Sequence, residues 1–70
     1  MLVRGYDMKY DLTIKKLREK MFVTQEELAN ILLVSPITVN RWETGKFKPS
    51  IKMKKKLNEL FIKYGVIDQI

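Results

Sequence analysis

Apolar residues recur at helical spacing in the first and last thirds of the chain. In each stripe they follow one another mostly at intervals of three and four residues, with charged residues between them. This spacing predicts two amphipathic helices that each bury one face. The first stripe is Tyr10, Ile14, Leu17 and Met21, and the second is Met53, Leu57, Leu60, Phe61 and Tyr64. Ser50 is a suitable N-cap for the second of these helices, and Gly65 can end it.

Two shorter helices are marked between them by capping residues. Thr24, followed three positions later by Glu27, is the pattern of a capping box and predicts a helix that begins at Gln25. The expected buried stripe of this helix is Leu28, Ile31 and Leu32. For the next helix, Ser35 is a good N-cap and Gly45 supplies the left-handed residue that commonly ends a helix. Because few residues separate these helices, they must cross at a tight corner, as in a helix-turn-helix motif.

Val39 and Trp42 give the second short helix its apolar edge. A helix of about nine residues is not stable alone, so this edge must pack against its neighbours. We therefore expect Trp42 in the core rather than stacked on a nucleic-acid base. The side chains on its other faces, which are free to contact a partner, are Ile37, Thr38, Asn40, Arg41 and Thr44.

The composition argues against most classes of enzyme and against a membrane-spanning segment. The chain of 70 residues is long enough for one small domain, and it contains no cysteine and no histidine. Disulfides, thiolate metal sites and the commonest general base are therefore missing, and we expect no enzyme, no cofactor and no metal. No apolar run approaches the ~20 residues that span a bilayer, and no signal peptide is recognisable. A cytoplasmic protein without a membrane partner is expected.

Positive charge is concentrated after the second short helix. The net charge is +6, and residues 46–63 contain seven lysines against the single acid Glu59. Such a cluster attracts polyanions, among which nucleic acid is the first candidate. The alternative is a solvated lysine face on an ordinary helix.

The central segment resembles a known family. Residues 24–50, TQEELANILLVSPITVNRWETGKFKPS, closely resemble the helix-turn-helix of Xre/Cro-type phage and bacterial repressors, and VNRWETGKFKPS is the most specific part. The resemblance implies an all-α fold, a compact lambda-repressor-like bundle of four or five short helices. It also implies a small transcriptional regulator, a repressor as the expected kind, whose recognition helix at about residues 36–44 enters the major groove of double-stranded DNA. Relatives commonly bind a palindromic operator as a homodimer.

The resemblance also implies roles for individual residues. Gln25 matches a phosphate-binding position at the start of the first motif helix. The positions that face DNA on the recognition helix correspond to Ile37, Thr38, Asn40 and Arg41. Lys46 and Lys48 match the loop that lies along the DNA backbone, with Thr44 beside it. The resemblance covers roughly residues 12–60. From the start of the helical pattern at Tyr10 and its end at Gly65, the DNA-binding domain is expected at residues 10–64, with an N-terminal arm at 1–9 and a C-terminal tail at 65–70.

Two further pairs of residues bear on the resemblance. Arg18 and Glu43 match a partly buried ion pair that ties the first helix to the recognition helix in relatives. Phe22 and Leu33 stand where the family usually has glycine. A non-glycine residue at positive φ costs about 1 kcal/mol or more, so either the corner bends differently here or the strain is tolerated.

The chemistry of the recognition helix suits contact with base edges. Arg41 can donate two hydrogen bonds to guanine N7 and O6, although a contact with phosphate is the alternative. Asn40 can pair with adenine, or it is merely solvated or caps the helix. Ile37 suits the methyl group of thymine, but it could also pack under the neighbouring turn.

Other polar residues suit contact with phosphates. Ser35 and Thr38 can donate to phosphate oxygens, and their alternative role is local helix capping. Lys46, Lys48 and Lys52 offer positive charges to the backbone, which supply affinity and salt dependence without sequence discrimination.

A rival hypothesis is that the same fold serves as a protein-interaction module, such as an antitoxin or adaptor, because a fold does not determine a function. The exposed Ile37 and the apolar residues of the tail at 65–70 would fit this hypothesis, whereas the basic loop fits DNA better. The tail is expected either to pack on the core or to meet a second subunit. Nonspecific binding of nucleic acid by the lysines is a third alternative.

Overall fold

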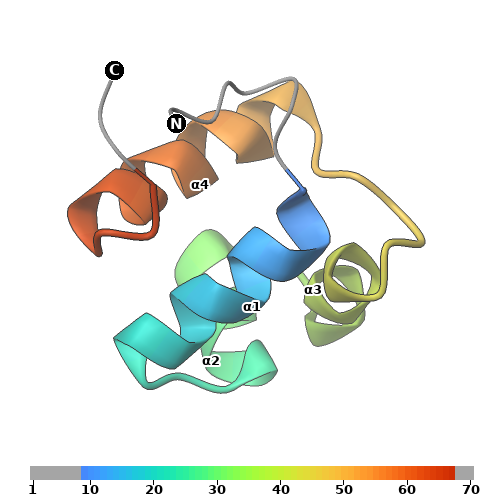
Figure 1. Cartoon of the computed structure of the whole chain (residues 1–70). Helices are drawn as coiled ribbons and strands as arrows, with labels where there is room; N and C mark the ends of the chain where they lie inside the picture. The colour runs from blue at the N-terminus through green and yellow to red at the C-terminus, as the bar shows by residue number, and fades with distance from the viewer. Residues whose placement is uncertain (1–8, 68–70) are drawn as a thin grey trace.

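Four helices account for most of residues 9–67, the part of the chain that the computed structural model describes (Figure 1). They are α1 (Tyr10–Met21), α2 (Gln25–Leu32), α3 (Pro36–Glu43) and α4 (Ile51–Lys63). The all-α fold expected from the sequence is therefore confirmed, with four helices in the described region. The predicted N-terminal arm lies outside the described residues except for Lys9, as do the last three residues of the predicted tail.

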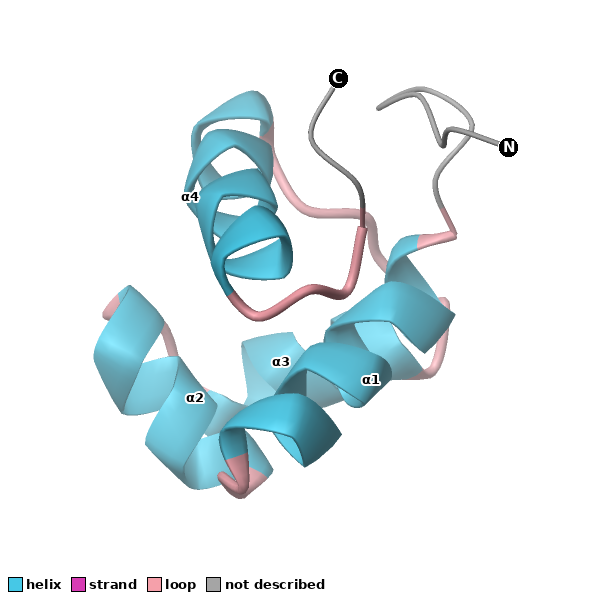
Figure 2. Ribbon diagram, turned by 60° about the vertical axis from the view of Figure 1, so that its left-hand side comes forward, coloured by secondary structure: helices cyan, strands magenta, loops and turns pink. Residues whose placement is uncertain are grey.

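The helices are arranged so that α4 lies on one side of the other three (Figures 1 and 2). Helix α1 contacts both α3 and α4, and α2 contacts α3. The short corner after Leu32 turns the chain between α2 and α3, as expected for a helix-turn-helix. Helix α3 is therefore held from behind by α1 and α2 and keeps its remaining face free.

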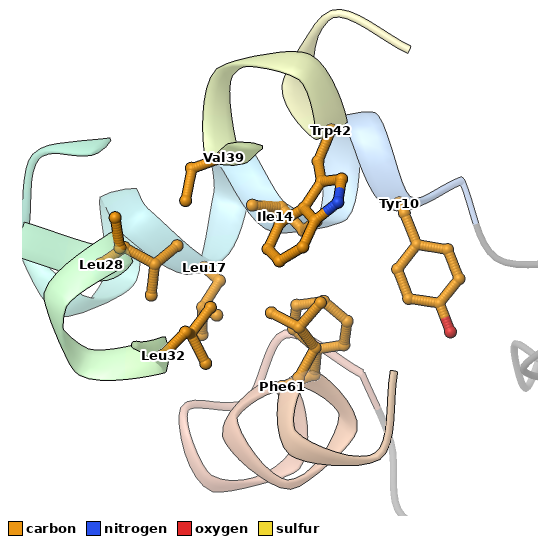
Figure 3. Packing of buried hydrophobic residues seen from close by; sticks show 10 residues of the cluster. Tyr10, Ile14, Leu17, Leu28, Leu32, Val39, Trp42 and Phe61 are labelled. Carbon is orange, nitrogen blue, oxygen red and sulfur yellow. The ribbon is translucent and has the colours of Figure 1, made fainter. Parts of the chain in front are cut away.

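The core contains side chains from all four helices (Figure 3). Phe61 points from α4 toward Ile14 and Leu17 of α1 and toward Trp42 of α3. Trp42 is only 4% exposed, which confirms its expected role as a core anchor. The buried cluster consists of Tyr10, Ile14, Leu17, Leu28, Ala29, Leu32, Val39, Trp42, Leu57 and Phe61.

The prediction for Ile31 was wrong. This side chain was expected in the buried stripe of α2, but it is 51% exposed. The residues of α2 that face the core are instead Leu28, Ala29 and Leu32. Ala29 is small and lets the neighbouring elements approach the helix closely. The helix is therefore rotated about its axis so that Ala29 faces the core, which places Ile31 at the outer edge.

The predicted N-caps are all present. The Thr24 hydroxyl accepts a hydrogen bond from the Glu27 backbone N–H at 3.1 Å, and the Glu27 carboxylate accepts one from the Thr24 N–H at 2.9 Å. Ser35 and Ser50 each accept a backbone hydrogen bond from the residue three positions later. These contacts satisfy donors that a helix start leaves unpaired, so α2, α3 and α4 each begin where their cap predicts.

Each helix is followed, within two residues of its last residue, by a residue in the left-handed conformation. These residues are Phe22 (φ 58°), Leu33 (φ 60°), Gly45 (φ 77°) and Gly65 (φ 71°). At each end the following N–H donates to the carbonyl five residues earlier, as from Val23 to Arg18 and from Val34 to Ala29. This is the Schellman motif, which satisfies the last carbonyls of a helix. Phe22 and Leu33, which stand where glycine was expected, thus both take a positive φ. Of the two alternatives, the strain is tolerated.

The described part of the tail packs on its own domain. Val66 and Ile67 are half-buried against the core, and the Val66 N–H donates to the Phe61 carbonyl at 2.7 Å. Of the two alternatives for the tail, residues 66–67 therefore follow the first. The rest of the tail, residues 68–70, which was also considered as a contact with a second subunit, lies outside the described region.

A buried ion pair ties α3 to α1. Arg18 donates from Nε and Nη2 to both carboxylate oxygens of Glu43, the second contact being 2.8 Å, and from Nη1 to the Val23 carbonyl at 3.3 Å. The Glu43 side chain is only 2% exposed. Gln25 of α2 donates to the same carboxylate at 3.1 Å. Glu43 at the end of α3 is thus held by residues of both neighbouring helices.

The surroundings of Glu43 stabilise its charged form. Burial raises the pKa of its carboxyl, but the hydrogen bonds from Arg18 and Gln25 and the positive charge of Arg18 together outweigh burial and hold the pKa below its ordinary value. The same carboxylate raises the pKa of Arg18 by accepting its hydrogen bonds. Both members of the pair are therefore ionised at neutral pH.

Replacing Glu43 by glutamine should destabilise the fold in a pH-dependent manner. At neutral pH the loss should be about 2 kcal/mol, because the partly buried Arg18 keeps its charge without its partner. Since the pKa of Glu43 is lower in the folded state, its contribution is present above the ordinary value of 4.5 and is lost as the pH falls through the folded value. The free energy of unfolding, measured by urea denaturation at several pH values, should show wild type and Glu43→Gln converging in acid.

The matched control is Glu59→Gln, because Glu59 is exposed on α4. This variant should stay within about 0.5 kcal/mol of wild type at neutral pH. A Glu43→Gln deficit that is the same at all pH values would contradict the role assigned to the charge.

Replacing Phe22 by glycine should stabilise the protein. The left-handed conformation costs a side-chain-bearing residue about 1–2 kcal/mol, and the greater freedom of glycine in the unfolded chain takes back about half of that gain. Phe22 is 93% exposed, so little packing is lost. We expect an increase of about 0.5–1 kcal/mol in the free energy of unfolding, and the same for Leu33→Gly. Phe22→Ala keeps the Cβ atom and should leave stability nearly unchanged; a gain equal to that of glycine would exclude backbone strain as the cause.

Candidate nucleic-acid interface

The outer face of α3 is a continuous stripe of exposed side chains. Ile37, Asn40, Arg41 and Thr44 are spaced by three, one and three residues, so they lie on one side of the helix axis. All four are exposed, and Ile37 is 62% exposed despite its apolar side chain. The opposite side of the helix is occupied by Val39 and Trp42, which are buried. The alternative in which Ile37 packs under the neighbouring turn is therefore wrong.

The start of α3 has its hydroxyl groups turned toward each other. Ser35 Oγ accepts the Thr38 backbone N–H at 3.2 Å, and the two side-chain oxygens lie 3.0 Å apart. The capping alternative is thus realised for Ser35. Thr38 is half-buried and lies beside the exposed stripe rather than in it.

A chain of hydrogen bonds joins the buried ion pair to the exposed stripe. Gln25 donates through Nε2 to Glu43 and accepts through Oε1 a hydrogen bond from Asn40 Nδ2 at 3.4 Å. The carboxamide of Gln25 is thus engaged inside the protein. Its backbone N–H lies in the first turn of α2, where such donors are left without a partner in the helix.

The loop after α3 is fastened to the end of that helix. The backbone N–H groups of Lys46 and Phe47 both donate to the Arg41 carbonyl, at 2.9 and 3.3 Å. The Thr44 hydroxyl donates to the Asn40 carbonyl at 3.0 Å, so at the end of the stripe it serves the helix terminus. Lys46 and Lys48 are exposed in this loop. Two exposed lysines therefore follow directly on the exposed stripe of α3.

One residue beside the stripe was given no role in the sequence analysis. The guanidinium carbon of Arg41 lies 5.1 Å from the ring centroid of Phe47, a cation–π arrangement. The only sequence signal was an aromatic residue between two lysines, which does not identify its neighbour. The contact arises because the loop turns back on α3.

The lysines of α4 are not all free. Lys52 and Lys55 are exposed, with Lys52 in the first turn, whereas Lys54 lies with its ammonium 5.3 Å from the Tyr10 ring centroid. Lys63 in the last turn similarly lies over Tyr64. The exposed lysines that follow α3 most closely along the chain are therefore Lys46 and Lys48 of the loop and Lys52 of α4.

The described residues offer no metal site. Over residues 9–67, histidine, cysteine, aspartate and glutamate form no group of three that could hold a metal ion. None of the described helices is long and apolar enough to cross a membrane.

Comparisons with known proteins agree with this geometry. The helix-turn-helix family HTH_3 matches residues 14–62, which include all of α2 and α3. A relative named as an HTH-type transcriptional activator, BcrR of Enterococcus faecalis, is 33% identical over 54 residues, covering 77% of this chain and 26% of that protein. The chain thus spans about a quarter of the length of this relative. No solved structure matches significantly.

The family match covers well over half of the chain and includes the elements that build the exposed stripe. It confirms the resemblance to Xre/Cro-type proteins and the expectation of a non-enzymatic protein. The chain belongs to the HTH_3 family of helix-turn-helix DNA-binding domains.

Proposed function

We propose that the protein binds specific sequences in double-stranded DNA and so regulates transcription, with α3 in the major groove. The observation that carries the proposal is the stripe of Ile37, Asn40, Arg41 and Thr44, exposed on a helix whose other side is buried. An α-helix fits the major groove of B-DNA, where each base pair presents a distinct set of donors and acceptors. A rigid helix with such side chains on its free face can distinguish these sets.

Three residues of the stripe are proposed to read bases. The Arg41 fork would donate to guanine, Asn40 would pair with adenine, and Ile37 would contact the methyl group of thymine. Asn40 donates one hydrogen bond to Gln25, which limits the orientation of its carboxamide. Its Oδ1 carries no hydrogen bond within the described residues, which leaves an acceptor for the N6 amino group of adenine.

The phosphate contacts are proposed to flank this stripe. Lys46 and Lys48 would lie along one strand, with Thr44 beside them, and Lys52 would extend the contact onto α4. Ser35 and Thr38 would contribute hydroxyl groups at the start of α3. For Gln25 we propose a contact through its backbone N–H at the positive end of α2, because its side-chain amide already donates to Glu43.

The direction of regulation proposed is repression. A domain that occupies a promoter lowers transcription by excluding other proteins, whereas activation requires a second surface. The relative BcrR is named as an activator, so a reporter gene placed behind the bound sequence is the direct test, and increased expression would overturn this part alone. Binding as a homodimer to a palindrome is proposed as well, and two half-sites one helical turn apart would support it.

A protein-interaction module is the second candidate, because Ile37 is an exposed apolar side chain. The apolar tail also suited this candidate, but it gives less support now, because Val66 and Ile67 pack on the core of their own domain. Stoichiometric co-purification of a protein whose binding is lost in Ile37→Ser would favour this candidate over DNA.

The proposal is tested by selecting duplexes from a random pool with the wild-type protein. Binding of the selected duplex, followed by fluorescence anisotropy, should be about 10³-fold or more tighter than binding of a scrambled one. Arg41→Ala should relax the preference at one base pair by about tenfold, because a bidentate contact is lost. Lys48→Ala should weaken both duplexes equally and reduce the slope of log K against log salt by about one.

Lys63→Ala is the matched control, since Lys63 lies at the other end of α4 from Lys52. It removes the same charge as Lys48→Ala. It should leave the preference for the selected duplex unchanged, and it should alter the salt dependence of binding much less than Lys48→Ala does. Equal binding of selected and scrambled duplexes by the wild type would overturn the proposal.

A further inference from the structure

Phe47 lies over the side chain of Arg41 although it is not part of α3. It is 57% exposed in the loop that leaves the helix, yet its ring faces the Arg41 guanidinium with 5.1 Å between the ring centroid and Cζ. The loop backbone produces this arrangement, because Gly45 takes a φ of 77° and the Phe47 N–H donates back to the Arg41 carbonyl. The backbone and the ring of Phe47 thus both contact Arg41.

Stacking orders an arginine without using its donors. An exposed arginine samples many rotamers, and ordering it on DNA costs side-chain entropy. Among residues 9–67 no carboxylate pairs with Arg41, so its five N–H donors are not occupied by an ion pair. An aromatic ring occupies only the face of the guanidinium, and the donors in its plane stay available for a base edge.

We propose that Phe47 is a positioning residue that sets the sequence specificity of Arg41. Its ring holds the guanidinium plane in the orientation in which the fork can meet a guanine, and so lowers the entropy lost on binding. This inference rests on the proposed function, because it assigns to Phe47 an effect on base recognition. Phe47 itself makes no base contact in this arrangement.

Two other roles for Phe47 make different predictions. If the ring contacted the DNA backbone directly, its loss would weaken binding to every sequence alike. If it only stabilised the loop through the hollow that it lines with Tyr10 and Trp42, its loss would lower the stability of the free protein. A positioning role is distinguished by a loss of discrimination at one base pair that requires Arg41.

The test compares Phe47→Leu with wild type on the duplex selected by the wild-type protein and on duplexes with single base-pair changes. Discrimination at the base pair relaxed by Arg41→Ala should fall about two- to fivefold, the range expected for an exposed cation–π contact. Discrimination at the other base pairs should be unchanged. Phe47→Tyr keeps an aromatic ring and should retain the wild-type preference.

Two controls isolate the contact. Phe22→Leu makes the same substitution at another exposed position and should leave discrimination unchanged. In an Arg41→Ala background, Phe47→Leu should cause no further loss, since the group that it positions has been removed. Thermal unfolding of each variant verifies that the compared proteins are folded.

A measurement without DNA supports the same test. In the free wild-type protein, the ring current of Phe47 should shift the Nε–H proton of Arg41 to lower frequency in the NMR spectrum, and the shift should vanish in Phe47→Leu. An unchanged resonance would overturn the contact in solution.

The DNA measurements separate failure of this inference from failure of the proposed function. If wild type discriminates and Arg41→Ala relaxes one base pair, but Phe47→Leu does not, the positioning role alone is overturned. A uniform loss on all duplexes would overturn it in favour of a direct backbone contact. Absence of any sequence preference in wild type would overturn the proposed function, and the positioning role with it.

Discussion

The buried ion pair between Arg18 and Glu43 is the interaction on which the placement of α3 depends. Helix α3 has only eight residues, too few to be stable without neighbours. Burying Val39 and Trp42 supplies hydrophobic free energy, but apolar contacts alone leave a short helix free to rotate or slide. The two parallel hydrogen bonds from Arg18 restrict both movements, because both oxygens of one carboxylate must be met. Orientation of the exposed stripe is thus determined from inside the molecule.

The same carboxylate connects the core with the surface. Glu43 accepts from Gln25, and Gln25 accepts from Asn40, so one run of hydrogen bonds extends from α1 to the exposed side of α3. Arg41 is contacted instead by Phe47 of the following loop. Neighbouring residues of the stripe are therefore restrained by different elements, Asn40 by α2 and Arg41 by the loop. The helix carries the side chains, but its surroundings set their orientations.

Much of the fold was predictable because its signals are local. The caps at Thr24, Ser35 and Ser50 act within a few residues, so the helix starts follow from the sequence. The rotation of α2 depends on tertiary packing, and therefore Ile31 was misplaced. The contact between Phe47 and Arg41 could not be predicted either, because it requires the path of a loop. For the candidate interface, the stripe on α3 follows from helical spacing, whereas the internal engagement of Gln25 was visible only in the structure.

The two backbone hydrogen bonds that the Arg41 carbonyl accepts from the loop have a consequence for the geometry of binding. They join Lys46 and Phe47 to the last turn of α3, so the backbone at Lys46 is held at a fixed place relative to the helix. If Arg41 contacts a base and Lys46 a phosphate, as proposed, the backbone fixes the spacing between the origins of these two contacts. One residue inserted after Gly45 would change this spacing, so the two proposed contacts could no longer both be made in the same orientation of the domain.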